Sequence, residues 1–182
     1  MSKELKHIQL AKKGDKTAFS KLVKMHKNYV FSLIMNILKN REDAEDVLQN
    51  TFLKIYRKLN TFKGDSKFTT WIYKIAVNEA LAHKRLYKFK YAIENKSEPV
   101  TNKNAQTKLE LNERSNLIKQ AIEKLSETEQ LVISLFYLKE HKVKEIANIC
   151  ANSEGWVKIN LFRARNKLKE ILKNKNLSYG EG

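Results

Sequence analysis

The chain has 182 residues and a formal net charge of +16, with 42% apolar and 31% charged residues. A disordered polycation would be less apolar and a membrane-embedded protein would be less charged, so both classes are excluded. The sequence has 5 glycines and 1 proline, which disfavours β-sandwiches and barrels because they need many tight turns. A single cysteine, Cys150, excludes a disulfide framework and a cysteine-cluster zinc site.

The chain lacks the long apolar segments that membranes require. No run of about 18 apolar residues is present, which predicts that the protein does not insert into a bilayer. The first residues, MSKELKHIQLAKKGDK, contain no apolar core of a secretory signal. We therefore expect a protein of the reducing cytoplasm.

Apolar residues recur at three- and four-residue spacing along nearly the whole sequence, which predicts an all-α fold. Asn40 and Ser153 each precede a periodic segment as helix N-caps, and Ser126 with Glu129 forms a capping-box pattern. Gly14-Asp15 and residues 60–66 are expected to be loops. The expected helices span residues 5–11, 17–38, 41–59, 67–91, 109–125, 127–136, 142–150 and 154–169.

The stretch 93–108 has no apolar period and contains Pro99, the single proline of the chain. Such a composition is typical of an exposed, flexible linker. We therefore expect two small helical domains, residues 1–92 and 109–182, joined by this linker.

The positive charge is unevenly distributed. Residues 1–40 carry a net +7, residues 53–92 carry +8 and residues 142–182 carry +5, whereas residues 41–52 carry −3. Basic blocks on a folded chain favour contact with nucleic-acid phosphates, although a generally lysine-rich surface would look similar.

The short helices 142–150 and 154–169, joined by a three-residue turn, have a helix-turn-helix pattern. Val157, Leu161, Ala164 and Leu168 lie on one predicted face. Trp156, Ile159, Asn160 and Arg163 then point the other way, toward a duplex, with Lys158, Arg165 and Lys167 flanking them near phosphates. An ordinary helical hairpin with solvated charges remains an alternative at this point.

Four acids, Glu42, Asp43, Glu45 and Asp46, form an acidic island within two turns of one predicted helix. The four histidines are scattered, so no metal site or catalytic acid–base pair is expected. Acids at a helix N-terminus can simply complement the helix dipole. They can also dock a basic partner surface, and the residues alone leave these two interpretations open.

Several ordered motifs resemble bacterial extracytoplasmic-function sigma factors over about residues 10–170. Asp43-Ala44-Glu45-Asp46-Val47-Leu48-Gln49-Asn50-Thr51-Phe52 resembles the family's core-polymerase-binding segment, preceded by Gly14-Asp15 and Ala18-Phe19. Phe62-Lys63-Gly64 and Phe68 to Asn78 resemble the −10 segment. Glu145-Ile146-Ala147, Ser153-Glu154-Gly155, Val157-Lys158 and Arg163-Ala164-Arg165 resemble its promoter-binding helix-turn-helix.

The resemblance implies a transcription initiation factor, not itself an enzyme, which needs no cofactor. Its implied partners are core RNA polymerase, promoter DNA and an anti-sigma factor. The implied polymerase-binding residues are Asp43, Glu45, Asp46 and Gln49. The implied −10 residues are Phe62, Lys63, Phe68, Trp71, Lys74, Asn78, Lys84, Arg85 and Lys88. The implied −35 residues are Lys144, Ser153, Trp156, Lys158, Ile159, Asn160, Arg163, Arg165 and Lys167.

Opening a duplex exposes bases that aromatic side chains can stack on, and Phe68, Trp71 and Tyr73 are expected to be available for this. For Trp71, a place in the core beside Ile72 and Ile75 is the stronger interpretation. The linker is implied to thread toward the active-site channel of the polymerase.

The promoter-binding half departs from the family pattern. Family members usually have Thr where Trp156 stands, and Ser and Arg where Ile159 and Asn160 stand. They usually have Leu-Gly-Ile in place of Cys150-Ala151-Asn152, and we expect Asn152 to supply the left-handed backbone conformation of that glycine. Recognition of the −35 element is therefore expected to be weaker or altered.

Two alternatives differ in class. A helix-turn-helix regulator that binds duplex operators without polymerase would account for residues 118–175 but not for 41–78. A nuclease that uses the acidic island would require divalent metal and would lose activity in Asp46→Asn.

Overall fold

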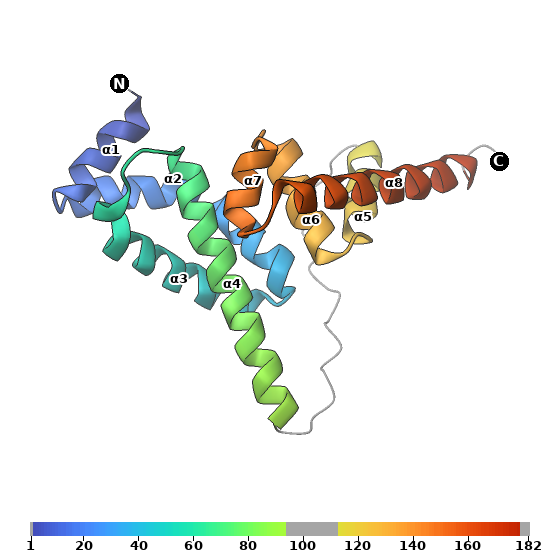
Figure 1. The fold of residues 1–182 in the computed structure, drawn as a ribbon, viewed down its shortest axis with the longest axis horizontal. Helices are drawn as coiled ribbons and strands as arrows, with labels where there is room; N and C mark the ends of the chain where they lie inside the picture. Colours follow the sequence, from blue (N-terminus) through green and yellow to red (C-terminus); the bar gives the residue numbers. More distant parts are fainter. Residues whose placement is uncertain (1, 94–112, 179–182) are drawn as a thin grey trace. The chain divides into compact units, whose positions relative to one another are not determined.

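The computed structural model describes residues 2–93 and 113–178, and within these ranges every regular element is helical (Figure 1). The expected all-α class is confirmed. The chain divides into two compact units, the first built from α1–α4 and the second from α5–α8, with the last turn of α7 grouped with the first. The predicted linker, apart from its first residue, lies outside the described residues.

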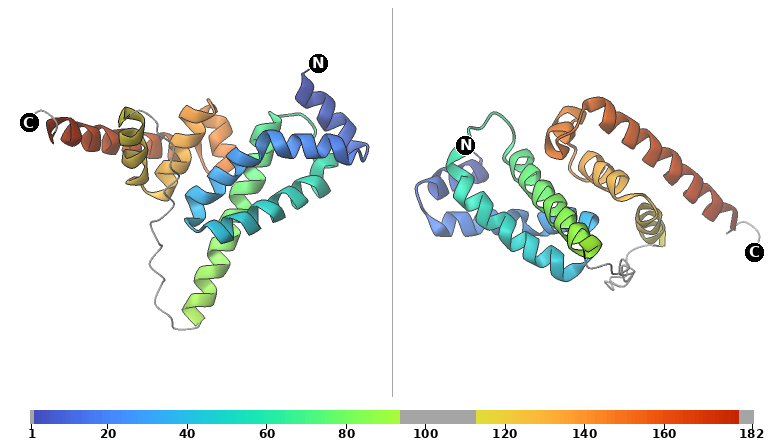
Figure 2. Two further views of the ribbon diagram at one scale, coloured as in Figure 1. Left: turned by 180° about the vertical axis from the view of Figure 1, so that it is seen from behind. Right: turned by 60° about the horizontal axis from the view of Figure 1, so that its bottom comes forward.

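The first unit contains α1 (Lys3–Lys12), α2 (Lys16–Leu38), α3 (Arg41–Lys58), a 3₁₀ turn (Leu59–Thr61) and α4 (Phe68–Ile93). Helices α2, α3 and α4 pack against one another, and α1 lies on α2 (Figure 2). The shared core is aliphatic and includes Leu22, Val30, Leu33, Ile34, Ile55, Ile72, Ala76 and Val77, each at most 2% exposed. This packing fixes which face of α3 and α4 remains open to a partner.

Side chains at the helix starts explain the boundaries in this unit. Asp15 Oδ1 accepts a hydrogen bond from the Ala18 amide at 3.0 Å, so α2 begins one residue before the predicted Thr17. Gly14 just before it has φ 93°, a left-handed conformation that suits glycine. Asn40 caps α3 as predicted, because its Oδ1 accepts from the Asp43 amide at 3.1 Å.

The second unit contains α5 (Glu113–Glu123), α6 (Glu127–Ile133), a π-helical segment (Ser134–Leu138), α7 (Val143–Cys150) and α8 (Glu154–Ser178). Helices α5 and α6 both pack on α8 (Figure 2). Val132, Leu135, Ile146, Val157 and Ala164 are fully buried at the centre.

The starts of α6 and α8 agree with the sequence, and the predicted start of α5 at residue 109 lies outside the described residues. The capping box is present: the Ser126 hydroxyl accepts from the Glu129 amide, and the Glu129 carboxylate accepts from the Ser126 amide at 2.8 Å. The Ser153 hydroxyl accepts from the Trp156 amide at 3.1 Å at the start of α8. The last helix continues to Ser178, beyond the predicted end at 169.

The turn of the helix-turn-helix corrects one expectation. Ala151, and not Asn152, has the left-handed conformation, with φ 51°. The Asn152 amide donates to the Ala147 carbonyl at 2.9 Å and the Ala151 amide to the Asn148 carbonyl at 3.3 Å. This is a Schellman ending, which places the left-handed residue at the position occupied by alanine.

Candidate functional site

The acidic island forms part of an open face of α3. Glu45, Asp46 and Gln49 are exposed, whereas Asp43 is half-buried with its Oδ1 3.7 Å from His83 Nε2 on α4. Arg41 Nε donates to Glu45 Oε1 at 2.8 Å, a surface pair of little energetic value. The structure thus leaves three of the four predicted polymerase-binding side chains accessible together.

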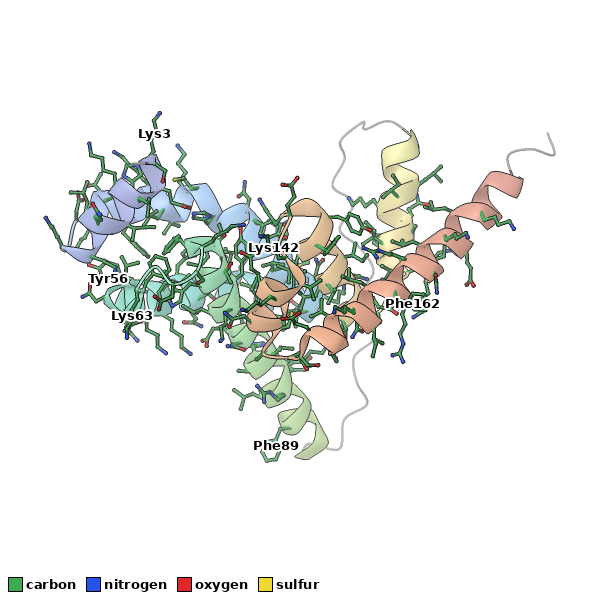
Figure 3. All side chains as sticks on the ribbon, turned by 45° about the horizontal axis from the view of Figure 1, so that its top comes forward. Lys3, Tyr56, Lys63, Phe89, Lys142 and Phe162 are labelled. Carbon is green, nitrogen blue, oxygen red and sulfur yellow. The ribbon has the colours of Figure 1, made fainter. Side chains whose placement is uncertain are left out.

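Two apolar residues extend this face and were missed at the level of sequence. Leu53 and Tyr56 follow Gln49 by four and seven positions, and they are 54% and 38% exposed. Their helical spacing from Asp46 and Gln49 was a usable signal, because residues that far apart share a helix face. We call Glu45, Asp46, Gln49, Leu53 and Tyr56 the α3 face; Tyr56 is labelled in Figure 3.

Phe62, in the segment before α4, forms an aromatic cluster with Phe68 and Trp71 in the first turn of α4. The ring centroids of Phe62 and Trp71 are 5.4 Å apart, and those of Phe68 and Trp71 are 5.9 Å apart and stacked. Phe62 and Phe68 are 6% and 5% exposed, while Trp71 is half-buried. Of these three rings, Trp71 therefore has the most surface free to meet a base.

The expectation that Phe68 and Tyr73 are available for stacking is wrong for this structure. Tyr73 is 1% exposed, and burial, followed by the nearby Glu4 charge, raises its pKa to about 12. Its ring lies 5.0 Å from that of Tyr29 in α2. Both Phe68 and Tyr73 belong to the hydrophobic core of the first unit, because they lie on the buried side of α4.

Helix α1 contacts the aromatic cluster through two of its polar side chains, Lys12 directly and Glu4 by way of His26. Lys12 Nζ donates to the carbonyl oxygen of Phe62 and lies 5.6 Å from the centroid of its ring. Glu4 Oε1 pairs with His26 Nε2 at 2.8 Å, and the His26 ring packs edge-on against Phe68 at 5.7 Å. Helix α1 thus contacts the segment before α4 through Lys12 and supports the first residue of α4 through Glu4 and His26.

The polar −10 candidates occupy different surroundings. Lys63 in the loop, Asn78 and Arg85 are exposed, and Lys74 is half-buried. Lys84 is not on the outer side of α4 as predicted, because its Nζ donates to the Ile37 carbonyl at the end of α2 at 3.2 Å. Lys88 belongs to α4, but its side chain lies outside the described part.

Helix α8 presents a face opposite to its buried residues Val157, Leu161 and Ala164. On this face Ile159 is 52% exposed and Phe162 is 64% exposed. Phe162, labelled in Figure 3, was assigned no role from the sequence, although its three-residue spacing from Ile159 was a signal. Trp156 is half-buried at the edge of the face, and Leu168 is only half-buried on the inward side.

The basic residues around α8 separate into two groups. Lys144 on α7, Lys158 and Arg163 are exposed. Arg165 Nε instead donates to Tyr137 Oη at 2.8 Å, with its guanidinium 5.3 Å from the Phe136 ring centroid, and Lys167 pairs with Glu129 at 2.9 Å. Arg165 and Lys167 are exposed as well, but their charged groups already have partners within the second unit, which the sequence did not indicate.

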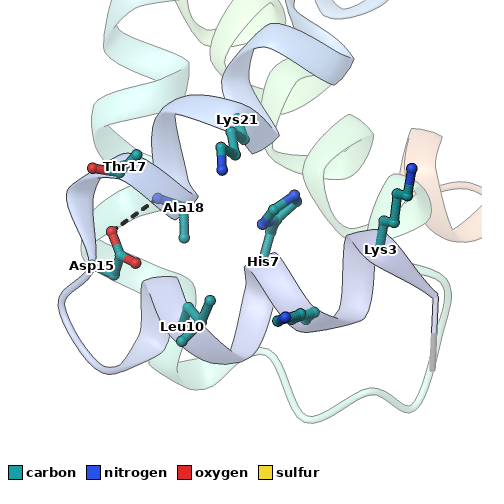
Figure 4. A pocket seen from close by; sticks show the side chains of 8 residues that line it. Lys3, His7, Leu10, Asp15, Thr17, Ala18 and Lys21 are labelled. Atoms are coloured by element: carbon teal, nitrogen blue, oxygen red, sulfur yellow. Dashed lines mark hydrogen bonds between the residues drawn. The ribbon is translucent and has the colours of Figure 1, made fainter.

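A cavity of about 370 Å³ between α1 and α2 is lined by Lys3, His7 and Lys21 among others (Figure 4). None of the predicted site residues lines it. Among residues 2–93 and 113–178, no group of three or more His, Cys, Asp or Glu side chains could hold a metal ion. No helix of these ranges is long and apolar enough to cross a membrane.

Comparison with known proteins agrees with this arrangement. Residues 22–88 match the family model of sigma-70 region 2, and residues 115–168 match that of sigma-70 region 4. The chain is 32% identical to the ECF RNA polymerase sigma factor SigW of Bacillus subtilis, over 93% of this chain and 96% of that protein. The chain belongs to the extracytoplasmic-function family of RNA polymerase sigma factors.

Other relatives support the same assignment of this sigma factor. The RNA polymerase sigma-H factor of Pseudomonas aeruginosa is 30% identical over 91% of both chains. Among solved structures, the sigma factor RpoE of Bartonella quintana, in complex with the anti-sigma factor NepR, has a TM-score of 0.68 and 25% identity, covering 85% of this chain and 96% of that one. A regulator without polymerase is not favoured, because region 2 occupies the first unit.

Proposed function

We propose that the α3 face is the surface by which this sigma factor binds core RNA polymerase. The observation that carries the proposal is the −3 charge of residues 41–52 in a chain of net charge +16, with Asp46, Gln49 and Leu53 of this helix exposed. Charge complementarity steers association, and a central exposed leucine supplies apolar area that binding would bury. Asp43 contributes at the edge of the face, and the protein would act in the cytoplasm with the polymerase.

The segment 62–71 and the exposed side of α4 are proposed to contact the −10 element. Trp71 is the aromatic side chain that would stack on an unpaired base, while the rings of Phe62 and Phe68 pack against it. Exposed Lys63, Asn78 and Arg85 would follow the backbone of the melted strand, together with Lys74 and Lys88 of α4. Lys84 would act by fixing α4 against α2.

Helix α8 is proposed to enter the major groove of the −35 duplex. Ser153 fixes the start of the helix, Ile159, Arg163 and the edge residues Trp156 and Asn160 approach base edges, and Lys144 and Lys158 contact phosphates. Arg165 and Lys167 would stabilise the helix rather than contact DNA. By analogy with RpoE bound to NepR, we also propose that an anti-sigma factor binds this protein.

The test uses the full-length protein, purified core polymerase and run-off transcription on a genomic DNA library. Asp46→Lys should weaken core binding about tenfold or more, because it reverses an exposed charge on the α3 face. Glu123→Lys, a charge reversal at an exposed position of α5, is the matched control and should leave core binding unchanged. Equal core affinity of the two variants, or no promoter-specific transcript from the unaltered protein, would refute the proposal.

A further inference from the structure

Ile159 occupies the middle of the open face of α8. Successive residues of a helix are rotated by about 100°, so Gly155, Ile159, Phe162 and Asn166 share the side opposite to Val157 and Ala164. Both Val157 and Ala164 are fully buried, whereas 52% of Ile159 and 64% of Phe162 is exposed. An apolar surface therefore stands where the helix-turn-helix geometry brings a helix nearest to base edges.

The polar side chains near Ile159 are turned away from that position. Asn160 Nδ2 donates one of its two hydrogens to the Trp156 carbonyl oxygen at 2.8 Å, which ties this amide to its own helix. Arg165 is held by Tyr137 and Lys167 by Glu129. Hydrogen-bond recognition at the centre of the face is thereby reduced.

Cations flank the apolar surface. Lys158 and Arg163 are exposed next to Ile159 and Phe162, on either side of the centre of the face. Phosphates border both edges of the major groove, so this charge pattern fits a duplex. The thymine C5-methyl is the apolar group that a base pair displays in that groove.

We propose that Ile159 is a specificity-determining residue that recognises a thymine methyl group in the −35 element. The inference rests on the proposed function, since it requires α8 to lie in the major groove. Cytosine at the same position would place its amino donor against an apolar side chain without a partner, which disfavours it. Phe162 extends the apolar surface beside Ile159.

The experiment begins with a promoter selected from a random duplex library by holoenzyme reconstituted from the full chain and core polymerase. Each −35 thymine is then replaced by deoxyuridine, which removes the methyl group and changes no hydrogen-bonding group. We expect one replacement to weaken binding about threefold to fivefold, the value of one buried methyl group. In Ile159→Ala the same replacement should have no effect.

Ile118→Ala is the matched control, because Ile118 is 47% exposed on α5 and should leave the deoxyuridine effect intact. Restoring a methyl group as 5-methylcytosine should improve binding relative to cytosine in the unaltered protein alone. Selective binding without any deoxyuridine effect that depends on Ile159 would overturn this inference and leave the proposed function standing. Ile159→Ala that lowers affinity for a co-purified protein, with unchanged DNA binding, would also overturn it.

Failure of the proposed function gives a different result. In that case the reconstituted enzyme selects no promoter sequence, and the inference falls with it.

Discussion

Ala151 is one of the non-glycine residues whose backbone is left-handed in the described part of the chain, together with Lys39 and Glu140. Left-handed φ values place the Cβ of an L-residue close to the carbonyl oxygen, at a cost of roughly 1–2 kcal/mol. The Schellman ending of α7 nevertheless places φ 51° at this position. The sequence favoured Asn152, because asparagine tolerates this conformation better. The register of the two hydrogen bonds that end α7 places the left-handed residue at Ala151 instead.

Ala151→Gly is expected to stabilise the protein by up to about 1 kcal/mol, because glycine adopts this conformation without steric cost. Urea denaturation of the full chain would measure the change. Ala147→Gly serves as control, since Ala147 lies inside α7 and is buried, so the same replacement should destabilise. Destabilisation by both variants would contradict the assignment of strain to Ala151.

Glu129 is a carboxylate buried to 3% exposure. Burial by itself raises its pKa, but hydrogen bonds from Lys167 and from the Ser126 amide and hydroxyl outweigh burial and lower the pKa below its ordinary value. A carboxyl group with a lowered pKa in the folded state stabilises the fold above the pKa it has when unfolded, and this contribution is lost as pH falls through the folded pKa.

Glu129→Gln should therefore unfold more easily than the unaltered protein at pH 7, by about 1–3 kcal/mol, because a buried charge-assisted hydrogen bond is lost. The difference should shrink as the pH falls through the lowered pKa of Glu129. Chemical denaturation at a series of pH values would measure it. A difference that stays constant across the acidic range would show that Glu129 acts through packing alone.

At the scale of elements, local signals in the sequence predicted helix positions well. Asn40, Ser126 and Ser153 cap helices as expected, because a cap depends on neighbours three residues away. Side-chain partners could not be predicted in the same way. Lys84 reaches a carbonyl 47 positions away and Arg165 a hydroxyl 28 positions away, and only the packed helices bring such groups together.

The contact between α1 and the segment before α4 gives a second test at this scale. Lys12→Met keeps the length of the side chain but removes its hydrogen bond to the Phe62 carbonyl. We expect faster hydrogen exchange in residues 61–67 and a loss of about 1–2 kcal/mol of stability. Lys13→Met alters an exposed neighbour and should change neither quantity. Unchanged hydrogen exchange in the Lys12 variant would show that α1 does not stabilise residues 61–67 through this hydrogen bond.

At the scale of the whole molecule, the net charge of +16 is opposite in sign to the acidic island on α3. A polymerase surface that attracts the acids would be repelled by the lysine-rich remainder, and DNA would be repelled by the acids. One charge change on the α3 face should therefore affect the two partners in opposite directions.

Asp46→Asn is expected to weaken core binding yet to raise affinity for non-specific duplex DNA slightly, about 1.5-fold to twofold at low salt. The gain in DNA binding should fade as salt rises to roughly 0.2 M, since exposed charges are then screened. Lys158→Ala on α8 should weaken DNA binding and leave core binding unchanged. Movement of both affinities in the same direction would contradict this division of the surface.

Helix α1 lies before residue 22, where the recognisable region 2 begins. Its Glu4 and Lys12 nevertheless reach His26 and Phe62 inside that region. The segment that matches sigma-70 region 2 is therefore shorter than the folded unit that contains it. A shortened protein starting at residue 22 would retain the whole segment that matches sigma-70 region 2 while losing two supports of its aromatic cluster. Promoter opening measured with such a fragment would therefore report on an aromatic cluster without its α1 contacts, and not on that of the intact chain.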